Sequence, residues 1–156
     1  THLTGPQEGT DTRFRVYYAN KDETIDNVTI NLDVDDTSSY GPEVLTIPNF
    51  VLPGRYRYSV YHYAGSGTIF SSPTRVELRL NDRTYVFNPA DDADSRVSSF
   101  RMWVVFDLIV DDELNVEVVE VNQHTTYSGA ETLGVEAFGG AKFSAKEAQP
   151  LPEKQY

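Results

Sequence analysis

Apolar and polar residues alternate along most of this chain, which is the pattern of half-buried β-strands. The clearest example is the segment 27–35, in which Val28, Ile30, Leu32 and Val34 fall on one face and polar residues on the other. Successive side chains of a strand point to opposite faces of its sheet. We therefore expect one face of this strand to be buried and the other to contact water.

The same alternation predicts further strands. They are expected at residues 13–18, 44–47, 55–63, 75–80, 84–87 and 115–121. Residues 102–110 are apolar at nearly every position, which is typical of a central strand covered on both faces. Asn81 and Asp82 predict a hairpin turn. About eight or nine strands separated by frequent turns predict an all-β fold, an antiparallel sandwich of the immunoglobulin-like or jelly-roll kind.

The composition of the chain changes after residue 122. We expect a β-sandwich domain over residues 1–122 and an extended C-terminal arm or linker over residues 123–156, which are richer in Gly, Ala and Ser. Within the arm, Leu133, Val135 and Phe143 lie in segments that alternate with small or polar residues. This alternation predicts that the arm adds strands to a sheet, either on its own molecule or on a neighbour.

The charge and composition narrow the range of partners. The chain carries 24 acidic and 13 basic residues, a net charge of −11, and therefore repels nucleic acid and anionic membrane surfaces. It has no cysteine, which excludes disulfides and thiol nucleophiles, and no apolar run long enough to span a bilayer. It begins at Thr1 rather than Met, which we interpret as processing or trimming. We expect its partners to be copies of itself, surface proteins or polysaccharide.

One acidic group has the composition of a calcium site. Asp33 and Asp35 lie on the same side of a predicted strand, about 7 Å apart. Together with Asp36 and Glu43 they offer the carboxylate oxygens that calcium prefers. The alternative is that these residues form the solvated face and turn of an acidic domain. A second acidic run, at residues 91–94, has the same two interpretations.

Motifs for catalysis are missing from the sequence. The three histidines, His2, His62 and His124, lack the close spacing of a zinc pair. There is neither a nucleophile elbow around a serine nor a glycine-rich loop that would hold a phosphate. The sequence therefore predicts a protein that is not an enzyme. It identifies no certain cofactor, and Ca²⁺ is the one candidate ion.

The tyrosines are candidates for ligand contact. In the predicted strand 55–63, Tyr56 and Tyr58 share one face, and Tyr61 and Tyr63 share the opposite face. Exposed tyrosines on a sheet stack on sugar rings or fill protein interfaces. The alternative is that they fill the core, as half of them must in a sandwich. Tyr61 and Tyr63 are the pair that we expect to be exposed.

Several segments resemble one family of bacterial domains. They are residues 2–6, 32–36 followed by 40–43, 54–60, and 102–106. These segments are similar to the motifs of the YfaP-like family of secreted bacterial domains of unknown function. The resemblance covers about residues 1–121, and it implies an immunoglobulin-like sandwich, an extracytoplasmic location and use as a module of surface or adhesive proteins. The family often has Asp residues before the opening His, and this chain does not show them.

Together these observations predict a non-enzymatic extracellular module with a structural or adhesive role. On this interpretation, it is a subunit of a surface assembly or filament joined by strand addition through the C-terminal arm. The alternative is a carbohydrate-binding module, with or without calcium.

Overall fold

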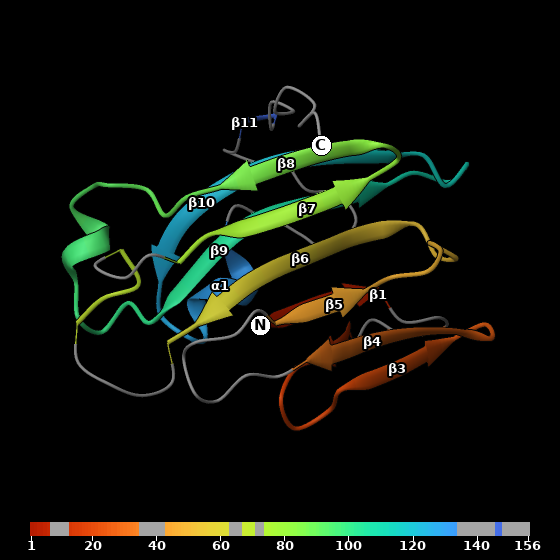
Figure 1. The fold of residues 1–156 in the computed structure, drawn as a ribbon, viewed down its shortest axis with the longest axis horizontal. Coiled ribbons are helices and arrows are strands. Elements are labelled where there is room, and N and C mark those ends of the chain that lie inside the picture. Colours follow the sequence, from red (N-terminus) through yellow and green to blue (C-terminus); the bar gives the residue numbers. More distant parts are fainter. Residues whose placement is uncertain (7–12, 35–42, 63–66, 71–73, 134–145, 148–156) are drawn as a thin grey trace.

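The computed structural model describes residues 1–6, 13–34, 43–62, 67–70, 74–133 and 146–147, and most of them lie in β-strands (Figure 1). The strands are β1 (His2–Pro6), β2 (Arg13–Val16), β3 (Asp22–Ile25), β4 (Val28–Val34), β5 (Val44–Thr46), β6 (Gly54–Tyr61), β7 (Val76–Leu80), β8 (Arg83–Phe87), β9 (Met102–Val110), β10 (Val116–Thr125) and β11 (Lys146–Glu147). One 3₁₀ turn, η1 (Asp94–Arg96), and one short α-helix, α1 (Gly129–Thr132), complete these elements.

The strands form three antiparallel sheets. The largest has the order β11-β10-β9-β6-β1-β2, the second has the order β3-β4-β5, and β7 pairs with β8 as a hairpin. Asn81 and Asp82 have φ angles of 48° and 67°, the left-handed values of the tight turn that matches strand twist. The predicted hairpin is therefore confirmed, as is the all-β antiparallel class.

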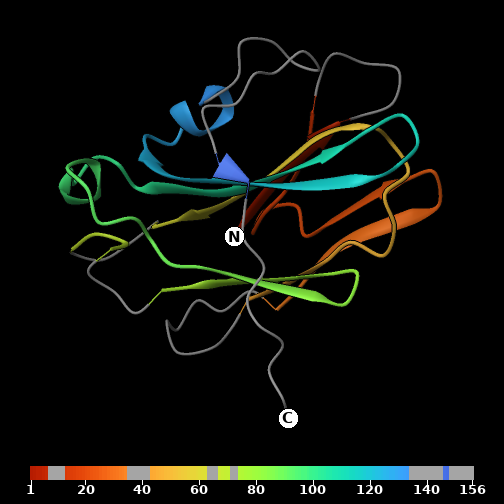
Figure 2. The same ribbon diagram turned by 90° about the horizontal axis from the view of Figure 1, so that it is seen from above.

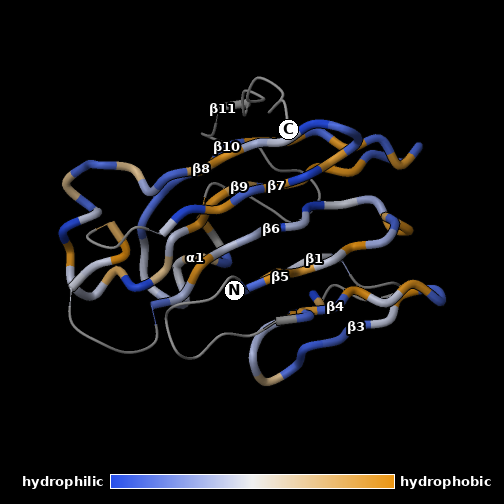
Figure 3. The backbone as a smooth tube through the Cα atoms, viewed as in Figure 1, coloured by the Kyte–Doolittle hydropathy of each residue, from blue (hydrophilic) through white to orange (hydrophobic). Residues whose placement is uncertain are grey.

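The main core lies between the large sheet and the two smaller sheets. Figure 2 shows the β7–β8 hairpin facing the large sheet, with α1 on the sheet's other side. The core cluster joins residues from all three sheets, among them Leu3, Phe14, Tyr56, Trp103 and Leu108 of the large sheet and Ile30, Leu32, Val76 and Phe87 of the smaller ones. Their burial follows the alternation of apolar and polar positions along the strands (Figure 3). The two-layer arrangement is that of a sandwich.

The outer face of the large sheet is also partly covered. Met102, Val104, Val121 and Ala130 form a second buried cluster, with Leu133 packed against it. Strand β9 is consequently buried on both faces, as predicted for residues 102–110. Strand β10 continues to Thr125, past the boundary expected at residue 122, and α1 packs back onto the sheet. No helix in the described part of the chain is long and apolar enough to cross a membrane.

The pairing register of the large sheet shifts at one level on both sides of β9. The shift falls between Tyr58 and Ser59 where β6 meets β9, and between Glu120 and Gln123 where β10 meets β9. At this level, the consecutive residues Val105 and Phe106 of β9 both belong to the main core. The inward and outward positions of β9 therefore exchange at this point.

Asn122 occupies the β10 side of this shift with a φ angle of 48°. Its Oδ1 accepts hydrogen bonds from the indole Nε1 of Trp103 at 2.8 Å and from the backbone N–H of Ala90 at 2.9 Å. Its Nδ2 donates to the carbonyl of Asn88 at 2.9 Å. One amide side chain thus joins the central strand to the segment that follows β8.

Candidate functional site

The strand register places polar residues of four strands in one row on the outer face of the large sheet. Arg15 of β2 lies opposite Thr4 of β1, Thr4 lies opposite Arg57 of β6, and Arg57 lies opposite Asp107 of β9. Directly paired residues of neighbouring strands are close enough for their side chains to interact. The row therefore brings residues that are far apart in sequence into one site.

Arg57 and Asp107 form a buried, two-pronged ion pair at the centre of this row. Both contacts, from Nε to Oδ1 and from Nη2 to Oδ2, are 2.7 Å long, and the two side chains are only 2% and 0% exposed. The remaining Nη1 of Arg57 donates to the carbonyls of Ala130 and Leu133. The paired geometry and these additional acceptors compensate for removing both charges from water. The same contacts hold α1 against the sheet.

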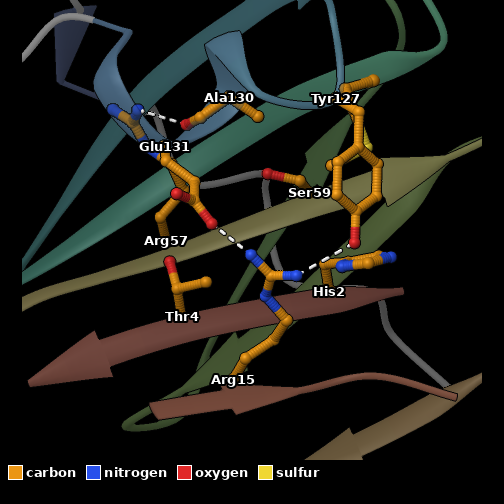
Figure 4. A pocket seen from close by; sticks show the side chains of 9 residues that line it. His2, Thr4, Arg15, Arg57, Ser59, Tyr127, Ala130 and Glu131 are labelled. Atoms are coloured by element: carbon orange, nitrogen blue, oxygen red, sulfur yellow. Dashed lines mark hydrogen bonds and ion pairs between the residues drawn. The ribbon is translucent and has the colours of Figure 1, made fainter. Parts of the chain in front are cut away.

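A small polar pocket opens beside this ion pair (Figure 4). It is lined by His2, Thr4, Arg15, Arg57, Ser59, Met102, Tyr127, Ala130 and Glu131. Its volume of about 20 Å³ is enough for about one water molecule. A larger ligand could therefore contact only the rim of the pocket.

Arg15 closes one side of the pocket. Its Nη1 donates to the hydroxyl of Tyr127 at 3.0 Å, and its Nη2 forms an ion pair with the Glu131 carboxylate (Figure 4). The guanidinium also lies 5.4 Å from the ring centre of Tyr17 and 5.6 Å from that of Tyr127. Both partners of the ion pair are partly exposed, so it adds little to stability and leaves the rim accessible to a ligand.

An aromatic patch adjoins the pocket, and we define it as His2, Tyr17, Tyr18, Tyr61 and Tyr127. The His2 ring stacks on Tyr17 with centroids 5.4 Å apart, and it meets the edges of Tyr61 and Tyr127 at 5.8 and 5.6 Å. Tyr18 and Tyr127 are 66% and 40% exposed. The patch is thus a group of mutually supported rings with an accessible outer side.

The His2 ring is uncharged at neutral pH. Burial lowers the pKa of His2 from 6.5 to about 4, and nearby positive charges, including that of Arg15, act in the same direction. The imidazole therefore contributes a flat aromatic surface to the patch rather than a cation.

The predicted calcium ligands are only partly placed by the structure. The Asp33 carboxylate is exposed and accepts a hydrogen bond from Thr46 Oγ1 at 2.9 Å. Glu43 is half-buried and accepts a hydrogen bond from the amino group of Thr1 at 2.7 Å. Asp35 and Asp36 lie outside the described residues. Within the described ranges, no three His, Cys, Asp or Glu side chains gather as metal ligands, so the calcium site stays a prediction.

The second acidic run uses its carboxylates within its own turn. Asp91 forms an ion pair with Arg96 at 2.7 Å. Asp92 Oδ1 accepts the backbone N–H of Ser95 at 2.9 Å, and the Asp92 carbonyl accepts the Ser95 hydroxyl. These contacts fit the interpretation of the run as a local turn.

The other predicted site residues have mixed outcomes. Tyr61 is half-buried within the aromatic patch, whereas Tyr63 lies outside the described residues. Leu133 directly follows α1 and packs, partly buried, on the outer cluster of its own molecule rather than extending away in an arm. Val135 and Phe143 also lie outside the described residues.

The C-terminal segment does add a strand to the large sheet. In β11, Glu147 pairs with Val119 of β10, and Lys146 pairs with Glu120. The pairing is antiparallel and involves the edge of β10 that faces away from β9. Strand addition by this segment thus occurs within one molecule.

Sequence reasoning missed the buried charges of the site. By alternation, Arg55 and Arg57 fall on the same face of their strand as Tyr61 and Tyr63, the pair expected to be exposed, yet both arginines are buried. One signal was available, because Asp107 interrupts the apolar run 102–110 and a charge in a strand covered on both faces needs a buried partner. Nothing local in the sequence marked His2 or Tyr127 as members of a patch.

Comparisons of the chain with family models, with curated proteins and with solved structures each find no match. The resemblance to YfaP-like domains therefore stays a prediction, and the function has to be argued from the geometry of the chain itself.

We expect Asp107→Leu to lower the free energy of unfolding by about 3–5 kcal/mol, because it leaves the Arg57 guanidinium buried without its counter-charge. The double variant Arg57→Met/Asp107→Leu should lose less of the free energy of unfolding than this single variant, since it removes both charges. Urea unfolding measures the free energy of unfolding of both variants. The control is Glu77→Gln, which breaks an exposed ion pair with Arg79 and should change stability by less than about 1 kcal/mol. A loss for Asp107→Leu no larger than that of the control would contradict the assigned role of the pair.

We expect His2 to make the protein less stable as the pH falls from 6.5 towards 4. In this window the unfolded chain binds a proton on His2 that the folded chain does not, because the folded pKa is about 4. The difference in unfolding free energy between the wild type and His2→Gln should therefore shrink as the pH falls. A titration of the ring by NMR checks the cause directly, and a midpoint near 6.5 would show that the ring is not buried in this way.

Proposed function

We propose that this chain is a non-enzymatic, extracellular structural and adhesive module whose C-terminal segment joins copies by strand addition. The observation that carries the proposal is the antiparallel pairing of β11 with the edge of β10. A segment that fills the edge of its own sheet can fill the same edge of an identical neighbour with the same contacts.

The lengths of the two strands favour exchange between copies. Strand β10 has 10 residues and β11 has 2, so in the described part of the chain β11 pairs with a small fraction of this edge. Free strand edges are templates for pairing with another chain. A short pairing is also easily released, because few hydrogen bonds hold it. These features support a segment that leaves its own sheet when another edge is available.

The chemistry of the outer face supports a binding role more than a catalytic one. A pocket with room for about one water molecule does not enclose a substrate. The net charge of −11 opposes non-specific association, so that joining would depend on a specific segment. The resemblance to secreted bacterial domains supports the extracellular location.

We expect the full-length chain to form dimers or longer assemblies at high concentration, and Lys146→Pro to remain monomeric. Proline at this position removes the backbone N–H of β11 and restricts its conformation. Lys146→Ala is the matched control, because it changes the same side chain but keeps the N–H. Light scattering over a range of protein concentrations measures the mass. Equal assembly by the proline and alanine variants, or a wild-type monomer at every concentration, would refute strand exchange.

A second candidate function is carbohydrate binding by the aromatic patch. The observation that favours it is the exposure of Tyr18 and Tyr127 within the patch. Tyr127 also contacts Arg15, which forms an ion pair with Glu131 at the pocket rim. Sugar rings pack on aromatic faces, and their hydroxyls take hydrogen bonds from polar groups at the rim of such a surface. The patch offers the aromatic faces, and the pocket rim offers the polar groups.

If the patch binds sugars, Tyr18→Ala and Tyr127→Ala should each weaken binding to a polysaccharide by about tenfold or more, which corresponds to about 1.4 kcal/mol. Phe70→Ala is the control, because Phe70 is also exposed but lies outside the patch. Affinity electrophoresis against a panel of polysaccharides, with calcium and with a chelator, makes the comparison. Binding to no member of the panel, or equal loss in the control, would count against this function.

A further inference from the structure

A second row of the outer face lies next to the row of Arg57. In it, Arg13 of β2 is opposite Pro6 of β1, and Arg55 of β6 is opposite Ile109 of β9. Arg55 and Arg57 are two positions apart on β6 and both are buried. We define Arg13, Arg55 and Arg57 as the arginine cluster.

Arg55 is the unusual member of this cluster. The residue is only 3% exposed, and its Nη2 donates to the carbonyl of Glu131 at 3.1 Å. Its Nε and Nη1 are buried, and no hydrogen-bond acceptor meets either of them in the described part of the chain. Two buried donors without acceptors on a charged group are costly, so they indicate a ligand that completes the site.

Arg55 is the member of the cluster that no carboxylate of the described residues contacts. Both oxygens of Asp107 are taken by Arg57. The Glu131 carboxylate is bound to Arg15. Burial, followed by the neighbouring charge of Arg57, lowers the pKa of Arg55 to about 9. Burial and Arg57 also lower the pKa of Arg13. The charge of Arg55 is therefore left without a counter-charge beside Arg57, in a protein of net charge −11.

We propose that the arginine cluster binds a small oxyanion, a carboxylate, sulfate or phosphate group, whose oxygens accept the free donors of Arg55. Guanidinium groups form strong charge-assisted hydrogen bonds with such oxygens. A water molecule would satisfy a donor but would leave the excess positive charge in place. Arg57 lies beside this site and adds attraction for the anion while it keeps its ion pair with Asp107.

The test uses the full-length chain at constant ionic strength, with sodium chloride replaced stepwise by sodium sulfate, phosphate or formate. We expect a saturable rise of the melting temperature in the wild type. We also expect a saturable shift of the Arg55 Nε–H signal in NMR spectra. Separate titrations with the tetrahedral anions sulfate and phosphate and with the planar anion formate show whether the site prefers a phosphate-type or a carboxylate-type ligand.

The matched variants separate a specific site from the general stabilisation that sulfate and phosphate give to proteins. In Arg55→Met, the saturable rise of the melting temperature should disappear or need an anion concentration at least about tenfold higher, which corresponds to an apparent affinity for the anion at least about tenfold weaker. Arg96→Met should keep the saturable rise of the melting temperature, because the Arg96 side chain is 63% exposed and lies outside the cluster. An Arg55→Met response equal to that of the wild type would overturn the proposal. If that variant does not fold, an unmoved Arg55 Nε–H signal in the wild type would overturn it equally.

Discussion

The outer face of the large sheet is organised around one buried ion pair, whose hydrogen-bonding groups all need partners within the protein. Arg57 of β6 and Asp107 of β9 face each other on neighbouring strands, and their side chains are almost completely buried. Their mutual contacts use both carboxylate oxygens, and the remaining guanidinium donor needs backbone carbonyls from elsewhere. The segment that contains α1 supplies them. A helix of four residues is too short to be stable alone, so its position depends on these contacts and on the apolar cluster beneath it.

That dependence connects the interior of the sheet to its surface. Tyr127 precedes α1 and Glu131 lies within it, so both reach Arg15 only when α1 is docked on the sheet. The rim of the pocket and part of the aromatic patch therefore depend on this buried ion pair. The carbonyl of Glu131 also receives Arg55, which places the arginine cluster under the same control.

The sequence predicted the elements whose side chains alternate cleanly or are apolar throughout. Strand β4, the central strand β9 and the turn at Asn81 are examples, because local patterns determine them. Strand β3 was missed, since three of its four residues are polar and it is stabilised by pairing with β4. The buried arginines were missed for a different reason. Alternation assigns a charged residue to the wet face, and only tertiary packing decides whether that face is covered.

The register shift gives strand β9 two halves in which the inward-facing positions have opposite parity. On one side of Val105, odd-numbered residues such as Trp103 point into the main core. On the other side, even-numbered residues such as Leu108 do so, which leaves Asp107 on the outer face. Relative to β6, Val105 is an extra residue of β9, because Tyr58 pairs with Phe106 and Ser59 pairs with Val104. Its loss would restore strict alternation along β9 and leave Trp103 in the core, so the bulge places one more apolar side chain in the core than a regular strand would. Strand β9 can therefore lose one residue at this level without turning Trp103 outward.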